Sequence, residues 1–189
     1  MKQLSDIKKI AVLGAGTMGP GIAQMYAMGG YEVTMWTRSE ATREKAIASL
    51  KAQFDTFEAE DLLSEPKETV LGRIRFALTV EECVEGADFI QETIVEKADA
   101  KKELYDQLVK IVPKDVIIAS NTSALNIFEI VPEELLPQQI ICHWYAPPHL
   151  IPLVEVVKSA EAPDEYAQIA LELLRKCGKT AVLMKKFIR

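Results

Sequence analysis

The sequence has little of what several broad classes of protein depend on. Three cysteines in 189 residues, Cys83, Cys142 and Cys177, are an odd number at spacings that fit neither a disulfide framework nor a zinc site. Only two histidines are present, and we expect no metal centre. No run approaches the roughly 20 apolar residues of a membrane span, and the N-terminal apolar run is too short for a signal peptide. The sequence therefore predicts a cytoplasmic chain without a membrane partner, whose thiols are reduced and mostly buried.

Positive charge is also in short supply. The 22 lysines and arginines face 28 aspartates and glutamates, which leaves a formal net charge of -6 and no basic block to neutralise a phosphate backbone. We therefore predict no nucleic-acid partner. The nine glycines and nine prolines are too few for a collagen-like or low-complexity chain, and the 49% of hydrophobic residues suffice for a core. The length fits one domain.

Segments typical of strands and helices alternate along the chain. Residues 10–13 and 31–36 are rich in strand-forming side chains and flank a helix-like apolar pattern that begins near Gly19. Strands that alternate with helices predict an α/β fold with a mostly parallel sheet covered on both faces. Further strands are expected at 73–76, 88–92, 116–119, 139–142, 153–157 and 180–184, and further helices at 40–57, 101–111 and 164–176.

A glycine-rich turn, Gly14-Ala-Gly16-Thr17-Met18-Gly19, joins the first strand to the first helix. In such a turn the backbone N–H groups and the helix dipole attract a pyrophosphate, and the middle glycine lets the backbone approach the ligand. Tight turns need glycine in any case, but this position between strand and helix favours a dinucleotide site formed by residues 14 and 16–19. We therefore expect a Rossmann-type doubly wound sheet, with residues 1–189 as one dinucleotide-binding domain that includes a helical arm at about 40–70.

The end of the second strand lacks the acidic residue that usually accepts hydrogen bonds from the adenosine ribose of NAD. Thr37 occupies that position, Arg38 follows it, and Arg43 comes a helical turn or two later. A guanidinium here could pair with the extra 2′-phosphate of NADP, or the arginines could be solvated surface residues. We place Thr37 and Arg38 in the cofactor site, with the choice between NAD and NADP open.

The two histidines differ in their surroundings. His143 closes the strand expected at 139–142, and ligands of open α/β sheets bind at the ends of strands. Glu155 lies inside the otherwise apolar stretch 153–157, where a carboxylate is costly unless it is paired, and an imidazole is its natural partner. These two residues are therefore candidates for proton transfer. His149 lies in a proline-containing turn, and we expect it to be exposed and inert.

A cluster of small polar residues, Ser120-Asn-Thr-Ser123, follows the strand expected at 116–119. Thr122 or Ser123 could cap a short helix from Ala124, but capping would satisfy one hydroxyl and not the whole cluster. Ser123 is therefore also a candidate for the chemistry of the site.

Taken together, several motifs resemble the L-3-hydroxyacyl-CoA dehydrogenase family over nearly the whole chain. They are the stretch from Gly14 to Gln24, Ile94-Val-Glu96, Ser120-Asn-Thr-Ser-Ala-Leu125, His143 and Leu153-Val-Glu-Val156. The resemblance implies an NAD(P)-dependent oxidoreductase that interconverts a 3-hydroxyacyl-CoA and a 3-oxoacyl-CoA by hydride transfer.

The same resemblance implies roles for individual residues. His143 would be the catalytic acid/base, Glu155 its partner, and Ser123 the hydroxyl that holds the 3-oxygen of the substrate. The ribose and nicotinamide side of the cofactor would lie against Glu96, Lys101 and Asn121.

The chain departs from the family pattern in ways that bear on the substrate. Besides Thr37, Ala146 stands where the family usually has Asn in its His-Phe-Phe-Asn-Pro stretch. The helical arm is acidic and would repel the phosphates of CoA. That charge, with Pro147-Pro148, favours an alternative branch that oxidises free 3-hydroxy acids such as gulonate or carnitine. A third possibility is a non-catalytic dinucleotide-binding module. The acidic residues of the second half of the arm are Asp55, Glu58, Glu60, Asp61, Glu65 and Glu68, against Lys67.

The sequence ends directly after the last expected strand. Members of the family continue into a helical domain of about 100 residues, which forms the homodimer and the far wall of the acyl pocket. The resemblance thus implies that this C-terminal domain is absent from the 189 residues, which would bind cofactor but turn over slowly or not at all, and would not form the family homodimer. Phe187 and Ile188 are expected to be exposed and to favour self-association.

Overall fold

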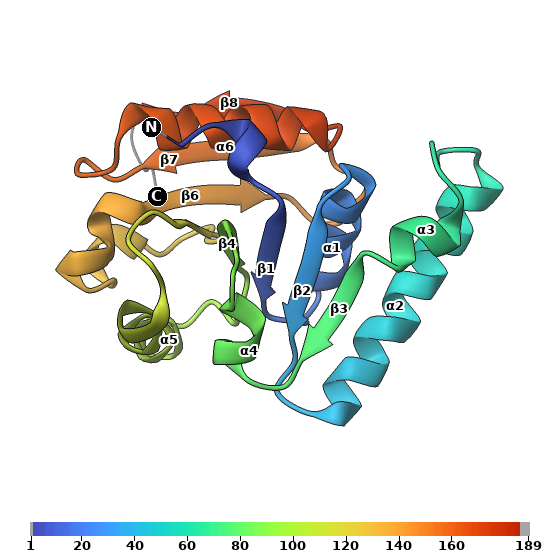
Figure 1. Cartoon of the computed structure of the whole chain (residues 1–189), viewed down its shortest axis with the longest axis horizontal. Helices are drawn as coiled ribbons and strands as arrows, with labels where there is room; N and C mark the ends of the chain where they lie inside the picture. Colours follow the sequence, from blue (N-terminus) through green and yellow to red (C-terminus); the bar gives the residue numbers. More distant parts are fainter. Residues whose placement is uncertain (1, 186–189) are drawn as a thin grey trace.

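The strands of the chain pair into one eight-stranded sheet in the order β3-β2-β1-β4-β5-β6-β7-β8 (Figure 1). The computed structural model describes residues 2–185, so Phe187 and Ile188 lie outside the described residues. All neighbouring strands are parallel except β6 and β7, which are antiparallel. This is the doubly wound Rossmann arrangement that the sequence predicts. The strands are β1 Lys9–Leu13, β2 Glu32–Trp36, β3 Ile74–Ala77, β4 Phe89–Glu92, β5 Ile117–Ser120, β6 Gln139–Trp144, β7 Leu153–Lys158 and β8 Thr180–Leu183.

Helices cover both faces of the sheet. One face packs against α1 (Gly19–Met28) and α6 (Asp164–Lys176), and α2 (Glu40–Ala59) packs on α1. The other face packs against α4 (Val80–Val84) and α5 (Ala98–Ile111). Alternate residues of each central strand enter the two cores, so that Val12 faces α1 and Leu13 faces α5. The remaining described elements are α3 (Lys67–Leu71) and three short 3₁₀ helices, η1 Leu4–Asp6, η2 Ile127–Glu129 and η3 Glu133–Gln138.

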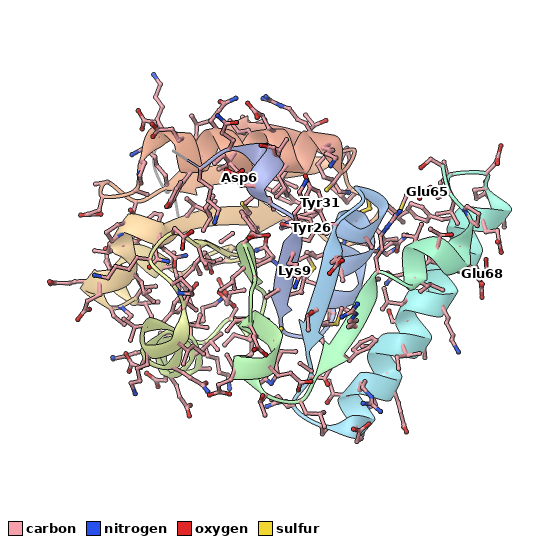
Figure 2. All side chains as sticks on the ribbon, viewed as in Figure 1. Asp6, Lys9, Tyr26, Tyr31, Glu65 and Glu68 are labelled. Atoms are coloured by element: carbon pink, nitrogen blue, oxygen red, sulfur yellow. The ribbon has the colours of Figure 1, made fainter. Side chains whose placement is uncertain are left out.

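The helical segment expected at about 40–70 is formed by α2 and α3 (Lys67–Leu71). Both lie along one side of the molecule beyond β3 (Figure 1), and Glu65 and Glu68 are labelled on their outer part in Figure 2. Lys67 Nζ lies 2.9 Å from Asp55 Oδ1 and 2.6 Å from Glu58 Oε2. Arg73 Nη2 lies 2.6 Å from Glu65 Oε2. Part of the acidic charge of the arm is therefore neutralised within the arm itself.

The turn that joins β6 to β7 folds back onto α1, and the expectation that His149 is exposed is wrong. A Cβ atom at Gly21 of α1 would lie 2.8 Å from Pro148 Cγ and 2.9 Å from His149 Nδ1. His149 is half-buried, its ring centroid is 6.0 Å from that of Phe57, and its Nδ1 atom has no hydrogen-bond partner among the described residues. Gly21 thus allows this turn to pack closely on α1.

The cysteines follow the prediction, because Cys83, Cys142 and Cys177 are all buried and unpaired. No helix in the described part of the chain, residues 2–185, is long and apolar enough to cross a bilayer. Within the same residues, no group of three or more His, Cys, Asp or Glu side chains gathers that could hold a metal ion.

We expect the stability of the fold to fall more steeply in acid because of His149. Burial, and then the positive charge of Lys179, lower the pKa of His149 below its usual value. A histidine with a lowered folded-state pKa adds stability above the unfolded value of about 6.5, and this is lost as the pH falls through the folded pKa. Urea unfolding at pH 7.5 and pH 5 should show a smaller acid loss in His149→Gln than in wild type. Equal losses in the two proteins would contradict a lowered pKa of His149 in the folded state.

Candidate active site

The carboxyl ends of four parallel strands meet at one edge of the sheet. Leu13 of β1 pairs with Glu92 of β4, and Glu92 pairs with Ser120 of β5, so the turns that follow these strands are neighbours. β6 comes next in the sheet and ends at Trp144. These strand ends open into one cavity of about 1010 Å³, whose walls include the glycine turn, residues 93–96 and His143.

The glycine turn fits a bound phosphate group. Gly14 has a φ of +123°, and a Cβ there would lie 2.7 Å from the carbonyl oxygen of Thr93. A Cβ at Gly19 would collide with the carbonyl oxygen of Gly14. Both glycines are thus required by the packing of the turn itself. Gly16 differs, because a Cβ there would meet nothing within 4 Å and the residue lines the cavity. An open approach to the backbone at Gly16, beside the N-terminus of α1, is what a pyrophosphate needs.

Glu96 organises the loop that follows β5. Its Oε1 atom accepts hydrogen bonds from Thr122 Oγ1 at 2.5 Å and from the backbone N–H groups of Ser123 and Ala124 at 3.0 and 3.1 Å. Partial burial raises the pKa of Glu96, but these bonds and the charge of Lys101 outweigh burial and lower it overall. The carboxylate lines the cavity and is held rigidly. Thr122 also accepts from the N–H of Leu125, but no helix of the described chain begins at Ala124, so the capping of such a helix weighed from the sequence is wrong.

His143 connects two of the other residues predicted from the sequence. Its Nδ1 atom lies 3.0 Å from Glu155 Oε2, and its Nε2 atom lies 3.0 Å from Ser123 Oγ. The antiparallel register pairs His143 with Glu155 directly across β6 and β7. An ionised carboxylate only accepts hydrogen bonds, so we assign the Nδ1 proton to the bond with Glu155. Nε2 is then left to face Ser123 and the cavity as an acceptor.

Tyr145 is a member of this constellation that sequence reasoning missed. Its hydroxyl donates to Glu155 Oε2 at 3.1 Å, the same oxygen that receives His143, and the two rings have centroids 4.5 Å apart. Burial first, and then the hydrogen bond and the negative charge of Glu155, raise the pKa of Tyr145. The signal in the sequence was a tyrosine where the family's His-Phe-Phe-Asn-Pro stretch has phenylalanine.

Asn121 bridges two strand ends at the floor of the cavity. Its Nδ2 atom donates to Thr93 Oγ1 at 3.1 Å, and its Oδ1 atom accepts from the N–H of Trp144 at 3.0 Å. The residue lines the cavity, as expected of a cofactor neighbour, but both ends of its amide already have partners in the protein. It therefore fixes the spacing between the loop after β4 and the end of β6.

Lys101, which the resemblance places beside the cofactor, does not line the cavity. It is fully buried beneath the cavity wall, where Nζ lies 2.7 Å from both carboxylate oxygens of Glu92 and 3.3 Å from Glu96 Oε2. Glu92 is also fully buried and accepts from Ser120 Oγ and from the N–H of Ile94. Sequence reasoning missed Glu92, although the argument used for Glu155, an acid at a buried strand, applies equally to it.

Thr37 is likewise outside the cavity. It is fully buried, and its hydroxyl donates to the carbonyl oxygen of Ala77 at 3.4 Å. Its neighbours Trp36 and Arg38 do line the cavity, together with Thr42 from α2, as do Thr17 and Met18 from the glycine turn. The position that carries the ribose-binding acid in NAD-specific proteins is thus closed off by the sheet.

Comparison with known proteins agrees with this arrangement. The family described as "3-hydroxyacyl-CoA dehydrogenase, NAD binding domain" matches residues 9–187. The chain belongs to this family. NAD is accordingly its cofactor, and the glycine turn, Glu96 and the cavity between them are the residues that fit it.

Individual members of the family are similar over nearly the whole chain. A probable 3-hydroxybutyryl-CoA dehydrogenase of Bacillus subtilis (strain 168) is 38% identical over 96% of the chain and 64% of its own length. An L-carnitine dehydrogenase of Streptomyces griseus is 29% identical over 96% of the chain and 53% of its own length.

Among solved structures, an NAD⁺-dependent 5-formyl-3-hydroxy-2-methylpyridine 4-carboxylic acid 5-dehydrogenase superposes with a TM-score of 0.85 at 29% identity. That match covers 96% of this chain and 59% of the other. The chain therefore spans less than two thirds of the length of these relatives.

The Glu92–Lys101 pair should act on stability and not on cofactor contact. Lys101→Met leaves Glu92 buried without its counter-charge, so we expect a loss of about 3 to 5 kcal/mol in unfolding free energy. The double variant Glu92→Gln/Lys101→Met removes both charges and should recover part of that loss. Urea unfolding of the three proteins measures this. A stable Lys101→Met with weakened NADH binding would instead support a direct cofactor contact.

The shared oxygen of Glu155 can be tested through Tyr145. Replacing Glu155 by Gln removes the negative charge that raises the pKa of Tyr145, so that pKa should fall toward 10. Carbon NMR of labelled tyrosine Cζ atoms follows the titration, and Tyr145→Phe assigns the resonance. Tyr166, whose pKa is raised by burial and by Asp115 and Glu165, serves as the internal control and should not move. An unchanged pKa of Tyr145 in Glu155→Gln would contradict the contact between Tyr145 and Glu155.

Proposed function

We propose that the chain is the NAD-binding and proton-transferring part of a dehydrogenase that interconverts a 3-hydroxyacyl thioester and its 3-oxo form. The observation that carries the proposal is the hydrogen-bonded series Ser123–His143–Glu155, which opens into the same cavity as the glycine turn. Hydride chemistry at a hydroxyl-bearing carbon needs a base for the hydroxyl proton beside the cofactor, and this cavity supplies both.

His143 is the proposed acid/base. Its Nε2 atom carries no proton and accepts from Ser123. When Ser123 turns to the substrate, Nε2 would take the proton of the substrate's 3-hydroxyl, or return it in the reverse direction. Glu155 holds the Nδ1 proton and stabilises the imidazolium that forms, and Tyr145 holds Glu155 from the other side. Imidazole is the usual side chain for proton exchange near neutral pH.

Ser123 would bind the 3-oxygen of the substrate by donating its hydroxyl to it, in exchange for the contact with His143. The loop that carries Ser123 is fixed by Glu96, so the hydroxyl stays within reach of His143. NAD, when bound along Gly14–Gly19 and against Glu96, supplies the hydride acceptor or donor. Asn121 and Trp144 keep the floor of the cavity at a set distance from the loop after β4.

The same series of side chains is also the arrangement of a serine hydrolase, and the loop geometry argues against that use. A serine nucleophile needs nearby backbone N–H groups to stabilise the oxyanion of the acyl intermediate. The N–H groups of Ser123, Ala124 and Leu125 all donate to Glu96 Oε1, at 3.0, 3.1 and 3.4 Å. With these donors occupied by a carboxylate, proton exchange at His143 is the chemistry that the site favours.

The thioester is favoured by the family, whose description names 3-hydroxyacyl-CoA, and by the Bacillus subtilis relative. A free 3-hydroxy acid is the second candidate, supported by the L-carnitine dehydrogenase relative and by the acids of the arm that lack an ion pair with Lys67 or Arg73, namely Glu60, Asp61 and Glu68. Acetoacetyl-CoA reduction and L-carnitine oxidation, measured side by side, distinguish the two.

His143→Ala should remove turnover while leaving cofactor binding intact. General acid–base catalysis contributes about 10² to 10⁴ in rate, so we expect a loss of that order in NADH-dependent acetoacetyl-CoA reduction. The affinity for NADH, measured by equilibrium titration, should stay within about twofold, because the glycine turn that fits the phosphates belongs to the β1–α1 connection and not to β6, which carries His143.

Full activity in His143→Ala would rule the residue out. Tight NADH binding by the wild-type chain with no turnover of either substrate, even when a relative's C-terminal part is supplied, would instead favour the non-catalytic dinucleotide-binding module.

A further inference from the structure

The end of the cavity at β2 and α2 carries no carboxylate directed at a ribose. β2 ends at Trp36, which pairs with Leu13, the residue before the glycine turn, so the residues after Trp36 border the phosphate site. Thr37 is withdrawn into the sheet by its bonds to Ala77. Glu40, the first acid of α2, is ion-paired with Arg43 at 2.6 Å. No acid among these residues is left to accept the ribose hydroxyls.

A positive charge and one hydroxyl-bearing residue, Thr42, border the cavity at this point instead. Arg38 and Thr42 both line it, and the structure gives Arg38 no ion pair within residues 2–185. Ser39 caps α2 by accepting from the N–H of Thr42, and the Ser39 and Thr42 hydroxyl oxygens lie 3.1 Å apart. A guanidinium and a hydroxyl that line the same cavity have the charge and the donor groups that a phosphate monoester requires.

We infer that this site binds NADPH at least as well as NADH, with Arg38 as the residue that pairs with the 2′-phosphate and Thr42 as a second contact. An acid after β2 favours NADH because it accepts from the ribose hydroxyls and repels a 2′-phosphate. Here the acceptor is missing, so NADH loses the hydrogen bonds from its ribose. The charge that lines the cavity is positive, so a 2′-phosphate is attracted and not repelled. The inference rests on the cofactor site of the proposed function and not on its reaction.

Binding can be measured on the chain as it is, because Trp36 and Trp144 both line the cavity and are the two tryptophans of the sequence. Titration of tryptophan fluorescence with NADH and with NADPH should give a dissociation constant for NADPH equal to or below that for NADH. Arg38→Ala should weaken NADPH binding about tenfold, the equivalent of one charge-assisted hydrogen bond, and change NADH binding less than twofold. Added KCl should weaken NADPH binding more than NADH binding.

Lys45→Ala is the matched control, because it removes an exposed cation of α2 that does not line the cavity and leaves the Glu40–Arg43 ion pair intact. It should leave the ratio of the two affinities unchanged. Wild-type binding of NADH more than tenfold tighter than NADPH, or an equal loss of both in Arg38→Ala, would overturn the inference. Failure of hydride transfer with both dinucleotides bound would count against the proposed reaction only, whereas failure to bind either dinucleotide would overturn the cofactor site and this inference together.

Discussion

The active site depends on the reversal of chain direction between β6 and β7. Because β7 runs antiparallel to β6, its first residues return to the sheet edge at which the parallel strands end. Glu155, the third residue of β7, therefore lies opposite His143 without a separate loop to carry it. The register is fixed by Val154 and Val156, which are buried on either side of Glu155. A slip of one residue would turn the carboxylate into an apolar core, which is far more costly than the native pairing.

The turn between these two strands is held by hydrogen bonds from a buried lysine. Lys179, the residue before the last strand, donates to the carbonyl oxygens of Pro148 and Ile151 at 2.6 and 3.0 Å. Burial lowers the pKa of this lysine to about 8, so the fold accepts a costly desolvated amine in order to satisfy two buried carbonyl groups. Gly21 then allows the same turn to touch α1. Helix α1, which begins at the glycine turn, and the strand that carries His143 thus both contact this one turn.

The sequence predicts those parts of this site that follow from a strand or a turn with a local signature. The β1–α1 turn is marked by glycines whose spacing is specific, and Glu155 stands out as an acid inside an apolar strand. The exposure of His149 was predicted incorrectly, and the burial of Thr37 and Lys101 was not foreseen, because their surroundings are set by residues of other elements: Gly21, the carbonyl of Ala77 and the carboxylate of Glu92. Tyr145 was missed for the same reason, since its partner lies on the neighbouring strand. The direction of β7 could not be predicted either, because the alternation of strands and helices in the sequence does not show that β7 runs antiparallel to β6.

The two ends of the cavity are built by different elements, and this has a chemical consequence. The end that carries His143 and Glu155 is fixed by the β6–β7 register and by the buried Glu92–Lys101 pair, so few substitutions there would leave the geometry intact. The adenosine end is bordered by the short connection from β2 to α2, whose side chains reach the cavity without supporting the sheet, apart from Thr37. Residues 38–42 can therefore vary in charge without disturbing His143 or Glu155. Cofactor form and proton chemistry are consequently separable properties of this domain, and a change in one need not destabilise the other.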